Sequence, residues 1–382
     1  MRIAFFLSSI GDTDLALRTI ESMNGDHQVF IIALTNVAQQ RIENFSSPLL
    51  HSKRSLPELL HLGPELFPKD VCNPDQIRAI VESIDSDGID QVYCGVPSVN
   101  NQIPFQIALA LDNKPVLMAY EFMFKPESHC MWNYVFQLNK PNVTWALPLD
   151  SAKADFHPDQ KMTIVGHLSI DNAFSAGGAG SKSPESIREQ LGVLADQSLA
   201  FVSSTTQPVE IDKGFLNCLL SELPNHPHVQ VRLGLHPGIQ DLDAYLSEIL
   251  SVERAHPRAA SQFKIIFPDN LRSRLKSPNL SIDNPMFQQV FLKRNITGSE
   301  ASTAADRVAQ AVPGALLNQA VLEGKSAFAP EGKPYLPKNN FAKNASQFFS
   351  ERRKLPLNNK DLGLDEKTAG ERCAAILQAH LP

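Results

Sequence analysis

The chain alternates short apolar runs with amphipathic stretches, which is the pattern of a parallel sheet flanked by helices. Short continuous apolar runs predict buried strands, and apolar residues at three- and four-residue spacing predict helices. The segment 46–69, rich in Ser, Pro and Leu, is expected to be a loop. In the first half, the predicted strands are 3–7, 29–34, 91–95, 115–119, 143–147 and 162–165, and the predicted helices are 12–23, 74–84 and 102–111.

A Gly- and Ser-rich stretch at 175–183 separates two halves, and the alternation restarts after it. The second half is expected to hold strands at 199–203, 229–233, 263–267, 294–297 and 326–329, and helices at 211–223, 242–252, 301–310, 315–322 and 366–378. The fold class is therefore α/β, with two doubly wound Rossmann-like domains facing across a cleft. The expected division is an N-terminal domain at 1–172, a flexible linker at 173–184 and a C-terminal domain at 185–382.

Composition narrows the class of protein. The 382 residues are 43% hydrophobic and 20% charged, which suits a soluble globular chain too long for one core. A net charge of -6 offers no general basic field for nucleic acid. No apolar run reaches the ~18 residues of a membrane span. Five scattered cysteines without a Cys-x-x-Cys pair argue against disulfides or structural zinc, and they favour the reducing cytoplasm. We also expect no cofactor and no bound metal.

The loop after the first predicted strand carries Gly11, Asp12 and Asp14. Ligands of open parallel sheets bind beyond the carboxyl ends of the strands, where such loops lie. Gly11 permits a tight turn there and is counted among the donor-binding candidates. Each acid has an ordinary interpretation as a helix cap, and each also suits a general base that accepts a proton from a hydroxyl. No GxGxxG or Walker A sequence follows this strand.

The second half holds a histidine and a Gly-Ser loop at equivalent strand ends. His236, followed by Pro237 and Gly238, is expected at the carboxyl edge of the second sheet, where it either donates to a phosphate or simply ends a strand. The segment 297–303, Thr-Gly-Ser-Glu-Ala-Ser-Thr, leaves a strand and enters a helix. Free N–H groups and hydroxyls at such a start suit a diphosphate, although an ordinary N-cap has the same sequence.

The order of a strand, a Gly-Ser loop at a helix start, a helix, and then Gly324-Lys325 with Pro330 resembles the GT-B-fold nucleotide-sugar glycosyltransferases. Non-hydrolysing UDP-GlcNAc 2-epimerases are similar in the same way. The architectural resemblance spans the chain, whereas the motif covers only 297–330. It implies that the C-terminal domain binds a nucleotide-sugar donor and that the N-terminal domain holds the acceptor. The donor-binding residues that it implies are Gly298, Ser299, Glu300, Ser302, Thr303 and Gln319.

One departure bears on mechanism. Many retaining members pair a glutamate five residues before the glycine with a second one eight positions earlier, and this chain has Gln319 and Ala311 there. We therefore expect an inverting, metal-independent transfer. It needs one acceptor-side base. Asp12 is the first candidate, with Asp14 and Glu121 behind it, while His236 stabilises the departing phosphate.

Three functions remain open at this stage. The first is a glycosyltransferase that moves a sugar from a nucleotide donor to a glycan, lipid or protein acceptor. The second is a nucleotide-sugar 2-epimerase. The third is a protein that binds nucleotide without turnover, because a fold alone does not establish an activity.

Overall fold

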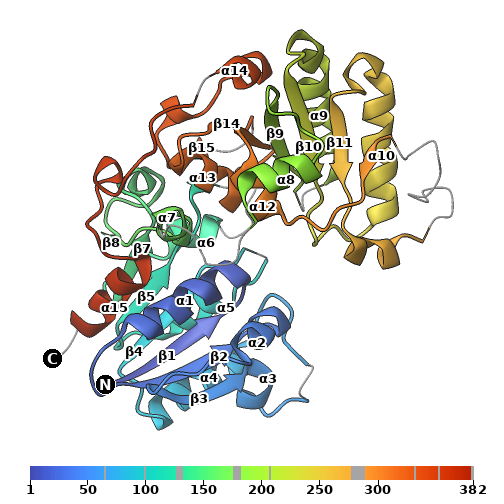
Figure 1. The fold of residues 1–382 in the computed structure, drawn as a ribbon. Helices are drawn as coiled ribbons and strands as arrows, with labels where there is room; N and C mark the ends of the chain where they lie inside the picture. Colours follow the sequence, from blue (N-terminus) through green and yellow to red (C-terminus); the bar gives the residue numbers. More distant parts are fainter. Residues whose placement is uncertain are drawn as a thin grey trace. The chain divides into compact units, whose positions relative to one another are not determined.

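The computed structural model describes residues 1–63, 66–98, 100–125, 132–174, 182–205, 208–276, 289–330, 333–351 and 353–379. The chain forms two compact units, one of Met1–Asp171 with Asn359–Pro382 and the other of Asn172–Asn358 (Figure 1). Each unit is built on its own parallel sheet with helices packed against it, so the predicted pair of Rossmann-like α/β units is confirmed.

The first unit contains a seven-stranded sheet in the order β3-β2-β1-β4-β5-β7-β8, and all neighbouring strands are parallel. The order reverses between β1 and β4, which makes their carboxyl ends the switch point of the sheet. The strands of this unit are β1 (Arg2–Leu7), β2 (Gln28–Ala33), β3 (Leu50–Ser55), β4 (Gln91–Gly95), β5 (Val116–Ala119), β6 (Phe124–Lys125), β7 (Val143–Leu147) and β8 (Lys161–Ile164).

Side-chain alternation along β1 explains why helices cover both faces of this sheet. Ile3, Phe5 and Leu7 point into the core beneath α1 and α15, whereas Ala4 and Phe6 face the side of α4. The helices are α1 (Ile10–Ser22), α2 (Asn36–Ile42), α3 (Leu56–Leu59), α4 (Pro74–Ser86), α5 (Ile103–Ala110), α6 (Trp132–Gln137), α7 (Leu168–Phe174) and α15 (Ala369–Ala379).

The second unit contains a six-stranded parallel sheet in the order β12-β11-β10-β9-β13-β14. Ala200 and Val202 of β9 face the core beneath α9 and α10, while Phe201 faces the side of α12. The strands are β9 (Ser198–Ser203), β10 (Val229–Gly234), β11 (Phe263–Ile266), β12 (Phe291–Leu292), β13 (Arg307–Gln310), β14 (Ser326–Phe328) and β15 (Lys333–Pro334). The helices are α8 (Pro184–Gln190), α9 (Val209–Glu222), α10 (Leu242–Ala255), α12 (Gly298–Ala304), α13 (Ala315–Leu322) and α14 (Ala345–Ser350).

Three expectations about elements are wrong. The strand expected at 294–297 is not formed, because β12 ends at Leu292 and residues 293–297 have no regular structure before α12. The segment 301–310 is not one helix, because α12 ends at Ala304 and residues 307–310 form the fully buried strand β13. A buried strand of four residues is too short to show an alternation of polar and apolar positions. Its sequence therefore cannot be told from a continuation of the preceding Ala-rich helix. The loop expected at 46–69 contains β3, an edge strand whose alternate residues are exposed and polar, and the short helix α3.

The end of the chain also differs from the expected division. The second unit ends at Asn358, and the following segment belongs to the first unit, where α15 packs against α1. The carboxylate of Asp171 accepts hydrogen bonds from the N–H of Ala369 at 3.0 and 3.2 Å and so caps α15. The last helix of the expected C-terminal domain, 185–382, therefore belongs to the first unit. Residues 175–181 of the expected linker lie outside the described residues.

Candidate functional site

A pocket of about 270 Å³ lies at the carboxyl edge of the second sheet. It brings together the two loops that the sequence singled out, the turn at His236 and the loop at 297–299. The lining residues are Phe201, Ser203, Gly234, Leu235, His236, Pro237, Ile266, Pro268, Ile296, Thr297, Gly298, Ser299 and Leu316. Most of the wall is apolar, and the polar groups gather on the strand ends and the start of α12. A small, mostly apolar site with a few placed polar groups is typical of ligand pockets.

The start of α12 is held by a reciprocal cap between Thr297 and Glu300. The Thr297 hydroxyl accepts the N–H of Glu300 at 3.1 Å, and the Glu300 carboxylate accepts the N–H of Thr297 at 2.8 Å. These bonds hold the pKa of Glu300 below its usual range, and Lys182 lies 3.6 Å from the carboxylate. Glu300 therefore caps the helix and is absent from the pocket wall, whereas Gly298 and Ser299 line it.

His236 is oriented by two hydrogen bonds. The backbone N–H of His236 donates to the Ser204 hydroxyl at 2.7 Å. The ring Nδ1 accepts the backbone N–H of Gly238 at 2.9 Å. A neutral imidazole that accepts at Nδ1 carries its proton on Nε2. Burial lowers the pKa of His236, so the neutral form is favoured near neutral pH. The Nε2–H of this exposed side chain is a donor for an acceptor atom of a ligand in the pocket.

A buried carboxylate behind this histidine was missed in the sequence. Asp212 of α9 accepts the N–H of Thr205 and the hydroxyl of Tyr245, each at 2.9 Å. Burial raises the pKa of Asp212. The charge of Asp212 opposes the effect of burial on His236, but burial is the larger cause, so the pKa of His236 stays below its usual value. An acid in the first turn of a helix is common, so only its burial among hydroxyls marks Asp212 as part of the site.

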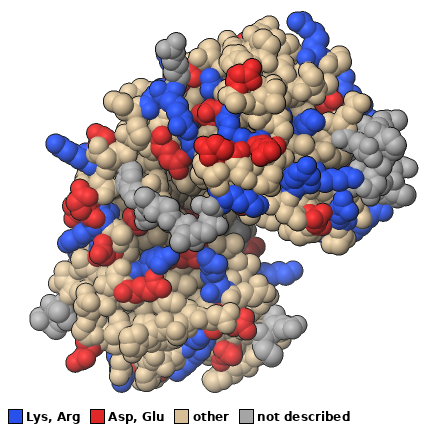
Figure 2. Space-filling view, in the orientation of Figure 1, with Lys and Arg blue, Asp and Glu red and all other residues tan. Residues whose placement is uncertain are grey.

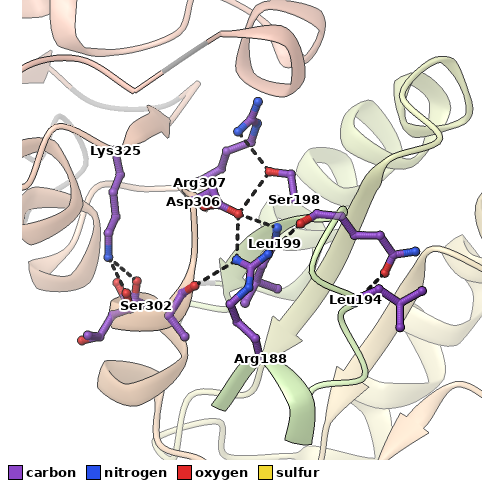
Figure 3. A network of polar contacts seen from close by, with 11 residues as sticks. Arg188, Leu194, Ser198, Leu199, Ser302, Asp306, Arg307 and Lys325 are labelled. Atoms are coloured by element: carbon purple, nitrogen blue, oxygen red, sulfur yellow. Dashed lines mark hydrogen bonds and ion pairs between the residues drawn. The ribbon is translucent and has the colours of Figure 1, made fainter. Parts of the chain in front are cut away.

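Besides Glu300, three predicted donor-binding residues of the second unit do not line the pocket. Ser302 is buried within α12, and its carbonyl accepts Lys325 Nζ at 2.7 Å (Figure 3). Thr303 is exposed, and its carbonyl also accepts Lys325 Nζ, at 2.9 Å. Gln319 donates to Glu323 at 2.8 Å, one turn along α13. Gly324, with φ of 71°, ends α13 as predicted, so Lys325 of the Gly-Lys motif anchors the end of α12.

A half-buried polar network lies at the amino end of this sheet. Arg188 donates to Asp306 at 2.8 Å, and Asp306 also accepts the N–H of Leu199 at 2.9 Å (Figure 3). The same carboxylate accepts the hydroxyl of Ser198 at 3.3 Å, and Arg307 donates to that hydroxyl. The network joins α8, β9 and the start of β13. It therefore sets the register of the central strands that carry the pocket at their other end.

In the first unit, Asp12 lies at the switch point of the sheet, and its side chain is fully buried. Its carboxylate accepts the N–H groups of Ser8, Ser9 and Thr13 at 2.9, 2.6 and 2.9 Å, and the Ser9 hydroxyl at 2.8 Å. Burial raises the pKa of Asp12 to about 7, and the hydrogen bonds from Ser8 and Ser9 act in the opposite direction. The contacts are those of a capping carboxylate that braces the loop.

Two further titratable side chains face the same switch point. Glu121 follows β5, and its Oε2 lies 3.7 Å from Nε2 of His167, which follows β8. Their side chains are 16% and 11% exposed. Gly11 makes room for Glu121, because a Cβ on Gly11 would lie 2.3 Å from Glu121 Oε1. Gly95 does the same for Asp12, with a Cβ placed 2.3 Å from the Asp12 Cβ.

Asp14 does not join this group. Its carboxylate forms a two-point ion pair with Arg41 of α2, at 2.5 and 2.9 Å. This ion pair links α1 to α2. Gly11, which the sequence placed with the donor-binding residues, lies beside Glu121 in the first unit.

Other charged groups of the chain pair locally. Asp150 bonds Lys153 at 2.7 Å, and Asp159 lies 3.6 Å from His157. Among the described residues, no cluster of three or more His, Cys, Asp or Glu side chains has the geometry of a metal site. On the described part of the face drawn in Figure 2, basic and acidic side chains are interspersed. No helix in the described ranges combines the length and apolar character that crossing a bilayer requires.

Comparison with known proteins supports the fold. No family model and no curated protein matches the sequence. The UDP-GlcNAc 2-epimerase of Methanocaldococcus jannaschii is similar in structure with a TM-score of 0.55 and 13% identity, over 99% of this chain and 100% of that one. A glycosyltransferase from Rickettsia africae ESF-5 has a TM-score of 0.54 and 14% identity, over 99% and 92%. The UDP-N-acetylglucosamine 2-epimerase of Rickettsia bellii has a TM-score of 0.53 and 10% identity, over 99% and 95%.

These likenesses define the fold class. Each covers both units, so the chain has the GT-B-like fold that the sequence resemblance predicted. The neighbours include epimerases as well as a glycosyltransferase, and at 10–14% identity they establish architecture alone.

Proposed function

We propose that the protein is a glycosyltransferase that uses a nucleotide-activated sugar and inverts the anomeric configuration. The observation that carries this proposal is the pocket at the carboxyl edge of the second sheet. There, His236 lines the same pocket as the loop of Gly298 and Ser299. Loops at these strand ends are where open α/β sheets bind nucleotides.

The pocket suits the nucleotide part of such a donor. Its apolar side chains, such as Phe201, Ile266 and Leu316, supply a surface for a base or ribose. The Ser299 backbone and hydroxyl and the Nε2–H of His236 supply donors for phosphate oxygens. A volume of about 270 Å³ is small for a complete nucleotide-sugar, so we place the nucleotide there and the sugar beyond its mouth.

In the proposed reaction, His236 assists departure of the nucleotide. Negative charge grows on the phosphate oxygen as the bond to the anomeric carbon breaks, and a fixed donor stabilises that charge. Asp212 favours the protonated imidazole when the phosphate charge grows. The acceptor nucleophile is activated by a carboxylate of the first unit, where Asp12 and Glu121 lie at the switch point.

A nucleotide-sugar 2-epimerase is the second candidate. The convergence of Asp12, Glu121 and His167 favours it, because proton removal and return at a sugar carbon needs several titratable groups. Two of the structurally similar enzymes named above are epimerases. Interconversion of a nucleotide-sugar with no acceptor present would support the epimerase, whereas sugar transfer with inversion would support the glycosyltransferase.

The test begins with a thermal-shift screen of UDP-, GDP- and CMP-sugars and the free nucleotides. A ligand at ~100 times its Kd stabilises the folded state by about 2.7 kcal/mol, which raises Tm visibly. The variant His236→Gln with Ser299→Ala should lose most of that shift, and His51→Gln, at an exposed histidine of the other unit, should keep it. An equal shift in the double variant and the wild type would overturn the proposal. Binding with no turnover of any donor would leave a nucleotide-binding protein.

A further inference from the structure

The turn that carries His236 is stabilised by its own backbone and by two neighbouring segments of the second unit. Residues 236–239 follow β10 and are called the histidine turn below. Within this turn, Nδ1 of the His236 ring accepts the N–H of Gly238 at 2.9 Å, and the His236 carbonyl accepts the N–H of Ile239 at 3.2 Å. These bonds orient the ring relative to the turn. The position of the turn in the pocket wall depends on contacts with other segments.

Ser204 holds the histidine turn from the side of β9. Its hydroxyl accepts the backbone N–H of His236 at 2.7 Å, and its own N–H donates to the carbonyl of Gly234 at 3.0 Å. Ser204 is buried, so bulk water does not compete for its hydroxyl. The next residue, Thr205, donates its N–H and its hydroxyl to the Asp212 carboxylate at 2.9 and 3.2 Å. The loop after β9 is therefore anchored to α9 at the point where it contacts the turn.

Arg274 holds the histidine turn from the side of β11. It ends the short 3-10 helix Asp269–Arg274, which follows that strand. Its Nη1 donates to the carbonyl of Pro237 at 2.6 Å, and its Nη2 donates to the carbonyl of Ile239. A guanidinium group is planar and presents its N–H groups in a fixed fork. One group that bonds two carbonyls of the same turn therefore restrains the shape of that turn, which the single ammonium of a lysine cannot do.

We propose that Ser204 and Arg274 are positioning residues of the nucleotide pocket. They hold the histidine turn from the two strands beside β10, so that His236 stands in the pocket wall before a ligand binds. Neither residue belongs to the described lining of the pocket. The inference rests on the proposed function and deepens it, because it assigns the affinity for the nucleotide in part to two residues behind the wall.

Preorganisation is the physical reason for an effect on affinity. A donor that is already fixed in its bound position costs a ligand less ordering than a mobile one. In the proposed complex, His236 donates to a phosphate oxygen, so a mobile turn weakens that bond. The net contribution of one hydrogen bond corresponds to about 3- to 10-fold in affinity, and we expect each positioning residue to contribute in that range.

The first measurement needs no ligand. The full chain is labelled with 15N-histidine, and the backbone amide signal of His236 is identified by its absence in His236→Gln. Ser204→Ala removes the acceptor of this amide, so the signal should move upfield and its exchange with solvent should become ~10-fold faster. Arg274→Lys keeps the charge and removes the fork, and it should speed exchange of the same amide about 3-fold.

Internal references separate position from general stability. The amides of His226 and His256 donate to backbone carbonyls of the same unit at 2.9 and 3.0 Å. A general loss of stability would speed exchange at these amides as well, whereas loss of position affects His236 alone. The matched control variants are Ser221→Ala, at an exposed serine of α9, and Arg272→Lys, in the same 3-10 helix as Arg274. Both should leave the His236 signal unchanged.

The second measurement is calorimetric titration with UDP, GDP and CMP. Ser204→Ala and Arg274→Lys should each weaken the tightest of the three about 3- to 10-fold, and the two control variants should bind as the wild type does. Because both residues act on one turn, the double variant should lose less than the product of the two single losses. Full affinity in Arg274→Lys would show that its charge matters rather than its fork, and would overturn its assignment.

The two measurements also separate this inference from the proposed function. An unchanged His236 signal in both Ser204→Ala and Arg274→Lys would overturn the inference and leave nucleotide binding standing. A changed signal with wild-type affinity would overturn the link between the turn and the ligand. If the wild type binds none of the three nucleotides, the proposed function fails, and the His236 signal alone then decides whether the two residues hold the turn.

Discussion

The buried amine of Lys325 gives the sharpest stability prediction, because the side chain is only 3% exposed and has three acceptors. Its Nζ donates to the carbonyls of Ser302 and Thr303 at 2.7 and 2.9 Å, and Glu323 Oε2 lies 2.7 Å away. The two carbonyls end α12, the helix whose first residues line the pocket. Lys325→Met fills similar space and removes all three interactions at once.

The expected cost follows from those contacts. A hydrogen bond from a charged donor contributes about 1.5–3 kcal/mol, so loss of the two carbonyl bonds costs about 3–6 kcal/mol. Burial lowers the pKa of Lys325, because the buried ammonium group loses its hydration. This desolvation cost is removed together with the amine in Lys325→Met, so the net loss of stability lies toward the lower figure. Relative to a typical total stability of ~5–15 kcal/mol, this change is large.

Urea unfolding followed by fluorescence and circular dichroism measures this cost. Lys343→Met, at an exposed lysine of the same unit, is the control and should stay within about 0.5 kcal/mol of the wild type. We also expect weaker nucleotide binding in Lys325→Met, since α12 loses its anchor. If Lys325→Met unfolds at the wild-type urea midpoint, the amine does not hold α12 and the argument from Figure 3 is refuted.

Three further predictions concern the surroundings of the two sites. Gly11→Ala should displace Glu121 and lower nucleotide release, with urea stability nearly unchanged; unaltered release would show that the position of Glu121 is unimportant. Burial raises the pKa of Asp12 from 3.8 to about 7, so its protonated form favours the folded state and the stability present below pH 4 is lost as pH rises to 7. At about 1.4 kcal/mol per unit this amounts to about 4 kcal/mol, and denaturation curves of Asp12→Asn should lack that slope. Tyr245→Phe removes a hydroxyl that donates to Asp212, and calorimetry should find a loss of about 1.5–3 kcal/mol; a neutral effect would contradict the network.

The sequence predicts most of the strands because their residues are continuous apolar runs. Residues 91–95 and 143–147 have the predicted bounds, and β1 and β9 differ by one residue. It also predicts that the turn at His236 and the loop at Gly298 lie at one edge, since both follow parallel strands. The strand β13 is not recognisable in the sequence, because Arg307 and Gln310 at its two ends are polar although both are buried, and Arg307 is held by the carbonyl of Phe349.

The rest of the candidate sites depends on contacts between distant residues. Glu121 and His167 are 46 positions apart, and only the order of β5, β7 and β8 brings them together. Ser302, Thr303 and Gln319 fit a phosphate-binding pattern by spacing, but none of them lines the pocket. Ser302 is buried within α12, Thr303 is exposed near the end of the same helix, and Gln319 on α13 donates to Glu323. Spacing along the chain does not encode which side chains a helix end presents to a pocket.

The central claim is that the pocket beside His236 binds the nucleotide of the donor. Hydrogen exchange of the full chain, with and without the nucleotide that raises Tm most, tests this directly. The account predicts slower exchange at residues 234–238 and 297–303, with the strands of the first sheet unchanged. Protection confined to other segments, with these two loops exchanging as in the free protein, would contradict it.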